Sequence, residues 1–155
     1  MNNQRRNVLK SGSGAALLSV LAAAGIIKPG IALADWNKAA FEAKNMADTL
    51  KALGASTPAD SKDVQLTAPD IAENGAVVPV GVASSLPNIS LVAILIEKNP
   101  NALAATFTLP EGTEANVQTR VKMGQTSNVY ALVKSDGKFF MATKEIKVTL
   151  GGCGG

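Results

Sequence analysis

The fold is decided by the stretch "SNVYALVKSDGKFFMATKEIKVTL", residues 127–150. Two runs rich in β-branched and aromatic residues flank the dipeptide Asp136-Gly137. An Asp-Gly pair between two such runs is the strongest short-range signal of a β-hairpin with a two-residue turn. Near the end of the second run, apolar and polar side chains alternate: Ile146, Val148 and Leu150 against Lys147 and Thr149. The stretch therefore predicts an antiparallel hairpin with one buried face.

Working back from the hairpin, five more segments have the composition of strands. They are "DVQLTA" (63–68), "AVVPVGVAS" (76–84), "SLVAILIEK" (90–98), "LAATFTLP" (103–110) and "ANVQTRVKMG" (115–124). The segment 90–98 contains the continuous apolar run "LVAILI", as in a central strand buried on both faces, whereas Pro79 favours an edge strand or a bulge. About seven short strands at this spacing predict an antiparallel β-sandwich of immunoglobulin-like architecture.

One helix is expected before the strands. In "DWNKAAFEAKNMADTLKALGAS" (35–56), apolar residues recur at helical spacing with charged residues between them. We predict a helix from about residue 37 to 53, capped by Asp35 or Asn37 and ended by Gly54. The pattern favours an amphipathic helix packed on the domain and leaves open a partner-binding helix. A linker, "GASTPADSKD" (54–63), follows.

Residues 1–34 have the pattern of an export signal. A basic start with the pair Arg5-Arg6 leads into a weakly hydrophobic run that ends at the small-x-small sequence 32–34. This pattern predicts cleavage between Ala34 and Asp35. The "RRNVLK" sequence resembles a twin-arginine (Tat) motif, with Val8 as a mild departure, and so favours Tat export to the periplasm. The expected organisation is a signal peptide (1–34), a helix-plus-sandwich domain (35–150) and a short C-terminal segment (151–155).

Composition excludes several classes of function. Without the four basic residues of the predicted signal, 11 basic and 12 acidic residues remain, so nucleic-acid binding is not expected. The sequence has no histidine and one cysteine. It therefore lacks the residues for a Ser-His-Asp triad, a Cys-His dyad, a histidine-ligated metal, an internal disulfide or a CxxC redox pair. We expect no metal, no cofactor, no catalytic residue, and no membrane contact after signal removal.

The lone cysteine lies in the C-terminal "GGCGG", composed of Gly151, Gly152, Cys153, Gly154 and Gly155. Glycines give a narrow, conformationally free tether, and an extended backbone places the thiol about 10 Å beyond Leu150. No cation lies within the segment to activate the thiol, so a partner would have to supply one. This pattern favours a carrier arm with Cys153 as the attachment point. An intermolecular disulfide, a frayed terminus and a cloning scar remain alternatives.

The twin-arginine-like signal, the helix containing "AFEAK" and "DTLKALG", the β-rich body and the terminal "GGCGG" together resemble the SoxY family. That family supplies the sulfur-carrier subunit of the periplasmic thiosulfate-oxidising (Sox) system. The resemblance implies sulfur intermediates bound to Cys153 as S-thiosulfonate and persulfide, and a carrier that is not itself an enzyme. It also implies a heterodimer with SoxZ and transfer among the cytochrome SoxAX, the manganese hydrolase SoxB and, where present, the sulfane dehydrogenase SoxCD. We expect SoxZ to contact an exposed apolar sheet face or edge around residues 77–82.

Overall fold

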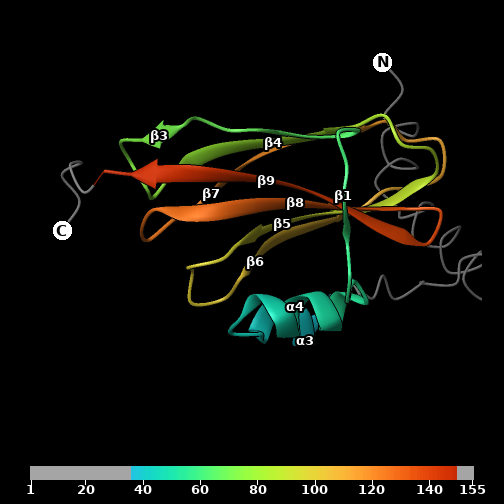
Figure 1. Ribbon diagram of the computed structural model, residues 1–155, viewed down its shortest axis with the longest axis horizontal. Helices are drawn as coiled ribbons and strands as arrows, with labels where there is room; N and C mark the ends of the chain where they lie inside the picture. Colours follow the sequence, from blue (N-terminus) through green and yellow to red (C-terminus); the bar gives the residue numbers. More distant parts are fainter. Residues whose placement is uncertain (1–35, 150–155) are drawn as a thin grey trace, which may run out of the picture. The chain divides into compact units, whose positions relative to one another are not determined.

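The computed structural model of the protein describes residues 36–149 (Figure 1). Several sequence predictions therefore lie outside the described residues. They are the signal pair Arg5 and Arg6, the Ala34–Asp35 cleavage site, and the arm residues Gly151, Gly152, Cys153, Gly154 and Gly155.

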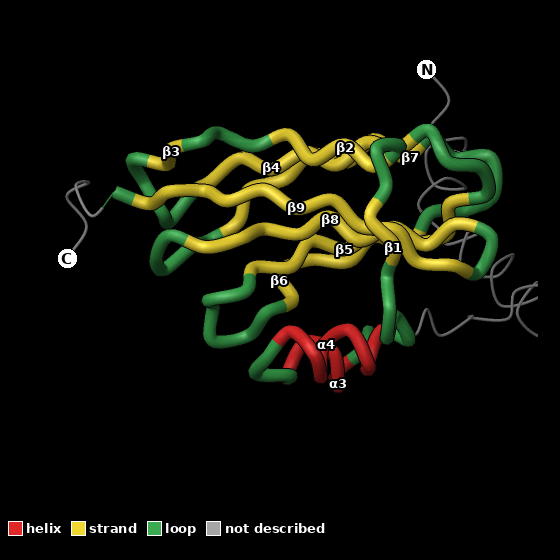
Figure 2. Tube along the Cα trace, viewed as in Figure 1, coloured by secondary structure: helices red, strands yellow, loops and turns green. Residues whose placement is uncertain are grey.

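The described chain is mostly β and forms two sheets (Figures 1 and 2). The larger sheet has the order β1 (Ala59–Asp60), β9 (Lys138–Val148), β8 (Ser127–Ser135), β5 (Ile89–Ile96) and β6 (Leu103–Thr108), and β3 (Ile71–Ala72) also pairs with β9. The smaller sheet has the order β2 (Val64–Thr67), β4 (Val78–Ser84) and β7 (Ala115–Val121). All pairs are antiparallel except β1 and β3, which run parallel to β9. The mostly-β sandwich expected from the sequence is confirmed.

The hairpin of β8 and β9 forms where the sequence predicts it. Ser135 pairs with Lys138 across the two-residue turn. Asp136 and Gly137 have φ values of 47° and 76°. Positive φ at both central residues matches the twist of the flanking strands and is adopted most easily by residues such as Asp and Gly. This local chemistry sets the register of the longest strand pair in the described chain.

The main core lies between the two sheets, because inward-facing valines and isoleucines from both sheets meet there. Val80 and Val82 of β4 and Val92 and Ile94 of β5 belong to this buried cluster. The opposite face of β5 is buried as well, since Ala93 and Leu95 belong to a second cluster. The prediction of a central strand buried on both faces is confirmed, and the strand runs over Ile89–Ile96 and ends before the exposed Glu97 and Lys98.

The single helix predicted over 37–53 is wrong in one respect, because the structure has two helices. They are α3 (Lys38–Glu42) and α4 (Met46–Leu53). Asn45 interrupts the pattern: its side chain accepts a hydrogen bond from the Asp48 N–H at 2.8 Å and caps α4. An asparagine side chain that can bond backbone donors competes with continuation of a helix. The expected ends are confirmed, with Asn37 capping α3 and Gly54 ending α4 in the left-handed conformation.

Both helices pack on the outer face of the larger sheet, next to β5 and β6 in Figure 1. Ala40 of α3 is fully buried in the cluster that contains Leu95, Leu103 and Leu132. The amphipathic pattern of this segment therefore reflects packing on the domain, as the sequence favours.

Pro79 does not lie in an edge strand, so this prediction is wrong. It lies in β4, which is the middle strand of the smaller sheet, and β4 pairs with β7 without a register shift. The pairing of β2 with β4 ends at Thr67, opposite Gly81. Pro79 therefore lies beyond the end of β2, where its missing N–H costs no bond to that strand.

Tyr130 provides a pH-dependent probe of the folded state, because it is the only tyrosine. Burial, and then the neighbouring Glu97 carboxylate at 3.2 Å, raise the pKa of its hydroxyl above the usual value. A raised phenol pKa means that the folded state favours the neutral form. This contribution to stability is present below the unfolded pKa of about 10 and is lost as pH rises through the folded value. Absorbance titration should therefore show phenolate at higher pH in the folded than in the urea-unfolded protein.

Glu97→Gln tests the second cause. This variant keeps the side-chain shape but removes the charge, so it should lower the folded pKa of Tyr130 while burial still holds it above the unfolded value. Identical titration curves for Glu97→Gln and the unchanged protein would contradict a role for the carboxylate.

Candidate functional site

Cys153 is the residue that the sequence most clearly indicates as functional. The described residues stop four positions before it, at Thr149. The part of the site that the structure describes is therefore the end of β9. We call residues 70–77 and 147–149 the arm root. Figure 1 shows β3, within this loop, beside the end of β9.

Backbone hydrogen bonds hold the end of β9 against the 70–77 loop. The Lys147 N–H donates to the Asp70 carbonyl at 2.9 Å, and the Thr149 N–H donates to the Ala72 carbonyl at 3.1 Å. Two residues further along the loop, the Asn74 carbonyl accepts from the Val77 N–H at 3.3 Å. Within the described residues, Thr149 therefore makes the last of these bonds, and the turn at 74–77 follows in the loop.

Gly75 allows the loop to approach β9 and its surroundings closely. A Cβ at this position would lie 2.4 Å from the Met123 carbonyl oxygen and 2.9 Å from Val148 Cγ1. The Met123 N–H donates to the Gly75 carbonyl at 2.7 Å, and the Val148 N–H donates to Thr126 Oγ1 at 3.0 Å. Only a residue without a side chain fits between these groups. Gly75 therefore contributes to fixing the position of the arm root.

Lys144 links the same loop to β9 from the side. In the alternation of side chains along β9, Lys144 occupies a core-facing position, yet its side chain is about a third exposed. The ammonium group lies 2.9 Å from the Asp70 carboxylate and donates to the Ala68 carbonyl. Asp70 is almost fully exposed, so the ion pair adds little to stability. Its main effect is to position the chain between β2 and β3 at the sandwich edge.

Neither a metal-ligating cluster nor a membrane-spanning helix lies within the described residues. Between residues 36 and 149, no group of three or more His, Cys, Asp or Glu side chains is arranged to hold a metal ion. Among the helices of this same range, none is long and apolar enough to cross a membrane. Cys153 remains the candidate reactive group from the sequence.

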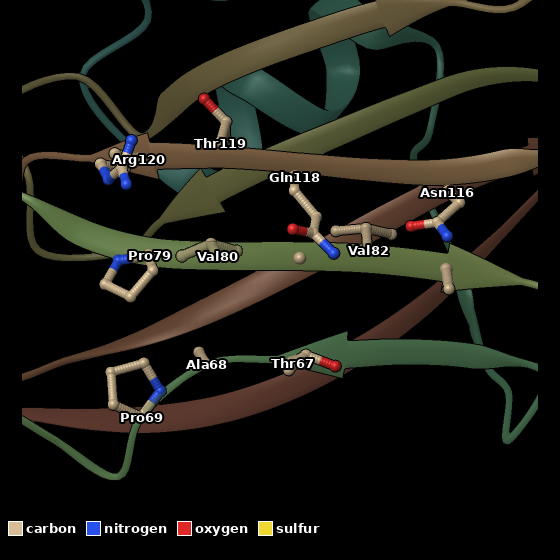
Figure 3. Close-up of a pocket in the computed structure, with 12 residues that line it drawn as sticks. Thr67, Ala68, Pro69, Pro79, Val80, Val82, Asn116, Gln118, Thr119 and Arg120 are labelled. Carbon is tan, nitrogen blue, oxygen red and sulfur yellow. The ribbon is translucent and has the colours of Figure 1, made fainter.

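A groove on the outer face of the smaller sheet was not found by sequence reasoning (Figure 3). It has a volume of about 640 Å³ and runs along β4. Its floor is low because the outward positions Pro79, Gly81 and Ala83 carry compact side chains or none. The sequence signal was the alternation of small outward residues with valines over 79–83. Figure 3 shows Pro69 and Pro79 at the same end of the groove.

Together these features define a class: a mostly antiparallel β-sandwich whose last described strand, β9, is followed in the sequence by a segment that carries a thiol. The sequence model of the family described as "Sulfur oxidation protein SoxY" matches residues 50–153. That match covers most of the chain and includes Cys153. The chain therefore belongs to the SoxY family of sulfur oxidation proteins.

Solved structures agree with this assignment. The structure of the sulfur carrier protein SoxY from Chlorobium limicola f thiosulfatophilum is 34% identical, with a TM-score of 0.59 over 66% of this chain and 96% of that chain. A superoxide reductase (neelaredoxin) from Ignicoccus hospitalis matches at 19% identity and a TM-score of 0.51, over 56% of this chain and 80% of that chain. At that identity the second likeness concerns the fold alone. No curated protein sequence matches the chain.

Proposed function

We propose that this protein is a covalent carrier of sulfur intermediates in thiosulfate oxidation, with Cys153 as the attachment point. The observation that carries the proposal is the SoxY family match, which extends through Cys153 in "GGCGG". The arm root supports it, because backbone hydrogen bonds hold β9 against the 70–77 loop up to Thr149, four residues before Cys153. The glycines on both sides of Cys153 have the widest backbone freedom of any residue.

The proposed chemistry has two main steps. In the first, the Cys153 thiol and thiosulfate form a disulfide-type S–S bond, releasing one proton and two electrons and giving Cys–S–S–SO₃⁻. The electrons go to a c-type cytochrome partner of the SoxAX kind. In the second, water attacks the sulfonate sulfur, and the terminal S–S bond breaks. The products are sulfate, one proton and a Cys153 persulfide, with a SoxB-type manganese hydrolase as the catalyst.

We propose that the carrier itself catalyses neither step. Its partners would be SoxZ in a heterodimer, SoxAX, SoxB and, where present, SoxCD to oxidise the persulfide sulfur. We place these events in the periplasm, after Tat export directed by Arg5-Arg6 and cleavage at Ala34–Asp35. The composition supports this location, because residues 1–34 have the charge and hydropathy pattern of an export signal.

The proposal is tested by the mass of the C-terminal peptide. Protein purified from cells grown on thiosulfate should carry, at Cys153, one thiosulfate-derived or sulfane-sulfur adduct that dithiothreitol removes. The matched control is protein from cells grown without thiosulfate, which should lack the adduct.

The alternative, an interaction module joined through an intermolecular Cys153 disulfide, gives a different result. It predicts a covalent dimer on non-reducing gels and, before any reduction, a Cys153 peptide that is linked to a second copy and carries no sulfur adduct, whether or not thiosulfate was present. A thiosulfate-independent dimer with no adduct would overturn the carrier proposal.

A further inference from the structure

The turn at the arm root contains the dipeptide Asn74-Gly75, the only Asn-Gly pair in the sequence. Asparagine is a thermolabile residue, because the backbone nitrogen that follows it can attack its side-chain amide. A glycine at the following position leaves that nitrogen accessible, since it carries no side chain to cover it. Asn74 is exposed in the structure, and Gly75 is half-buried. Sequence and exposure together therefore make Asn74 a candidate for this reaction.

The hydrogen bonds of the turn leave the reacting groups available. The Ala76 N–H donates to Asn74 Oδ1 at 2.9 Å, and the Val77 N–H donates to the Asn74 carbonyl at 3.3 Å. Among the hydrogen bonds between residues 36 and 149, the Gly75 N–H is not a donor. The attacking nitrogen is therefore free. The side-chain oxygen, on which negative charge would develop, already accepts a backbone N–H, and such a donor stabilises that charge.

The reaction is a deamidation in two steps and needs neither an oxidant nor a cofactor. In the first step, the Gly75 nitrogen forms a bond to Asn74 Cγ, and the side-chain NH₂ leaves as ammonia with the Gly75 amide proton. In the second step, water opens the resulting succinimide ring at one of its two carbonyl groups. Opening at Cγ gives aspartate at position 74. Opening at the backbone carbonyl gives isoaspartate, in which the main chain continues through the former side chain.

The isoaspartate product does not fit the present geometry of the arm root. It adds one carbon atom to the backbone directly before Gly75. Gly75 has no free space, since a Cβ there would lie 2.4 Å from the Met123 carbonyl oxygen, and its own carbonyl accepts from the Met123 N–H at 2.7 Å. The longer backbone must therefore displace the loop. The same loop contains Ala72, whose carbonyl accepts from the Thr149 N–H at 3.1 Å.

We propose that Asn74-Gly75 is a site of spontaneous deamidation in the folded protein, and that the isoaspartate formed there loosens the hold of the 70–77 loop on Thr149. This chemistry belongs to the chain itself and does not depend on the carrier function. Both products also replace a neutral amide by a carboxylate next to Glu73. The added charge and the longer backbone are therefore two separable changes, and only the second is specific to isoaspartate.

The first test measures the deamidation rate at mildly alkaline pH. The purified protein, with any subunit that accompanies it, and a free peptide of residues 70–79 are incubated side by side, and position 74 is followed by peptide mass and isoaspartyl methylation. The folded protein should react at least as fast as the peptide, because the peptide lacks a fixed hydrogen bond from Ala76. Asn88 is the internal control and should stay unchanged, since it is also exposed but precedes the β-branched Ile89. A slower reaction in the folded protein than in the peptide, or equal conversion of Asn88, would overturn the proposed site.

The second test measures hydrogen exchange of the Thr149 amide in the converted protein. Exchange should be about tenfold faster or more in the isoaspartate form, because a packed loop that must accept an extra atom opens more readily. The variant Asn74→Asp carries the same added charge on a normal backbone, so its Thr149 amide should exchange as in the unchanged protein. Equal acceleration in Asn74→Asp would assign the effect to charge, and unchanged exchange in the isoaspartate form would show that the loop absorbs the extra atom. Either result would contradict loosening by the longer backbone.

Discussion

Cys153→Ser should reduce thiosulfate-dependent sulfate release by the reconstituted system to background. A thiolate is both the nucleophile and the sulfur atom to which the cargo is bonded, and a serine hydroxyl can form neither a mixed disulfide nor a persulfide. The expected effect is complete loss of turnover and not a lower affinity. The free energy of unfolding should not change, because the buried clusters of the sandwich lie within residues 36–149. Sulfate release and urea denaturation measure the two quantities.

A relocated thiol provides the matched control for this variant. Thr108 is exposed at the end of β6. Combining Cys153→Ser with Thr108→Cys therefore keeps one thiol in the protein but moves it to a strand. If the arm is needed to carry the thiol into a partner's active site, this double variant should stay at background. Recovery of sulfate release by the relocated thiol would show that any accessible cysteine suffices. Normal sulfate release by Cys153→Ser alone would end the carrier hypothesis.

The strands were predictable where local chemistry decides the structure. Asp136-Gly137 defines its turn regardless of the rest of the chain, and the continuous apolar run of β5 requires burial on both faces. The two-residue strands β1 and β3 were not predictable, because they exist only through pairing with β9, which is distant in sequence. The break between α3 and α4 was missed because Asn45 lies within a helical pattern and its capping bond competes with that pattern.

The candidate site was predictable only in its chemistry. The residue type and its glycine neighbours identify Cys153 from the sequence, whereas the surface that presents it depends on tertiary structure. Ile71 reads as an ordinary apolar residue until the β3–β9 pairing places it beside Lys147. From the sequence, Gly75 looks like an ordinary turn glycine. The structure shows that a side chain there would meet the Met123 carbonyl and Val148, which are about 50 and 70 positions away in the sequence.

Gly75→Ala should therefore have the largest effect on stability of any single-methyl change at the arm root. The added Cβ would lie 2.4 Å from a backbone oxygen, that of Met123, which cannot move without displacing the end of β7. Overpacking of this kind costs about 1–3 kcal/mol, and we expect the free energy of unfolding to fall by an amount near the upper end of that range. Urea denaturation at constant m-value would measure the loss. Since Val148 is the second contact, hydrogen exchange of the Thr149 amide should also become faster.

Gly124→Ala distinguishes this steric cause from the general effect of replacing a glycine. Gly124 follows Met123 directly, has no atom within 4 Å of an added Cβ, and has no left-handed φ. Its substitution should change the free energy of unfolding by no more than about 0.5 kcal/mol and leave the Thr149 amide unaffected. Equal losses in the two variants would mean that backbone freedom, not the close approach at the arm root, explains Gly75. A stability loss confined to Gly75→Ala, together with faster Thr149 exchange, would show that the close approach of the 70–77 loop fixes the position of Thr149, four residues before Cys153.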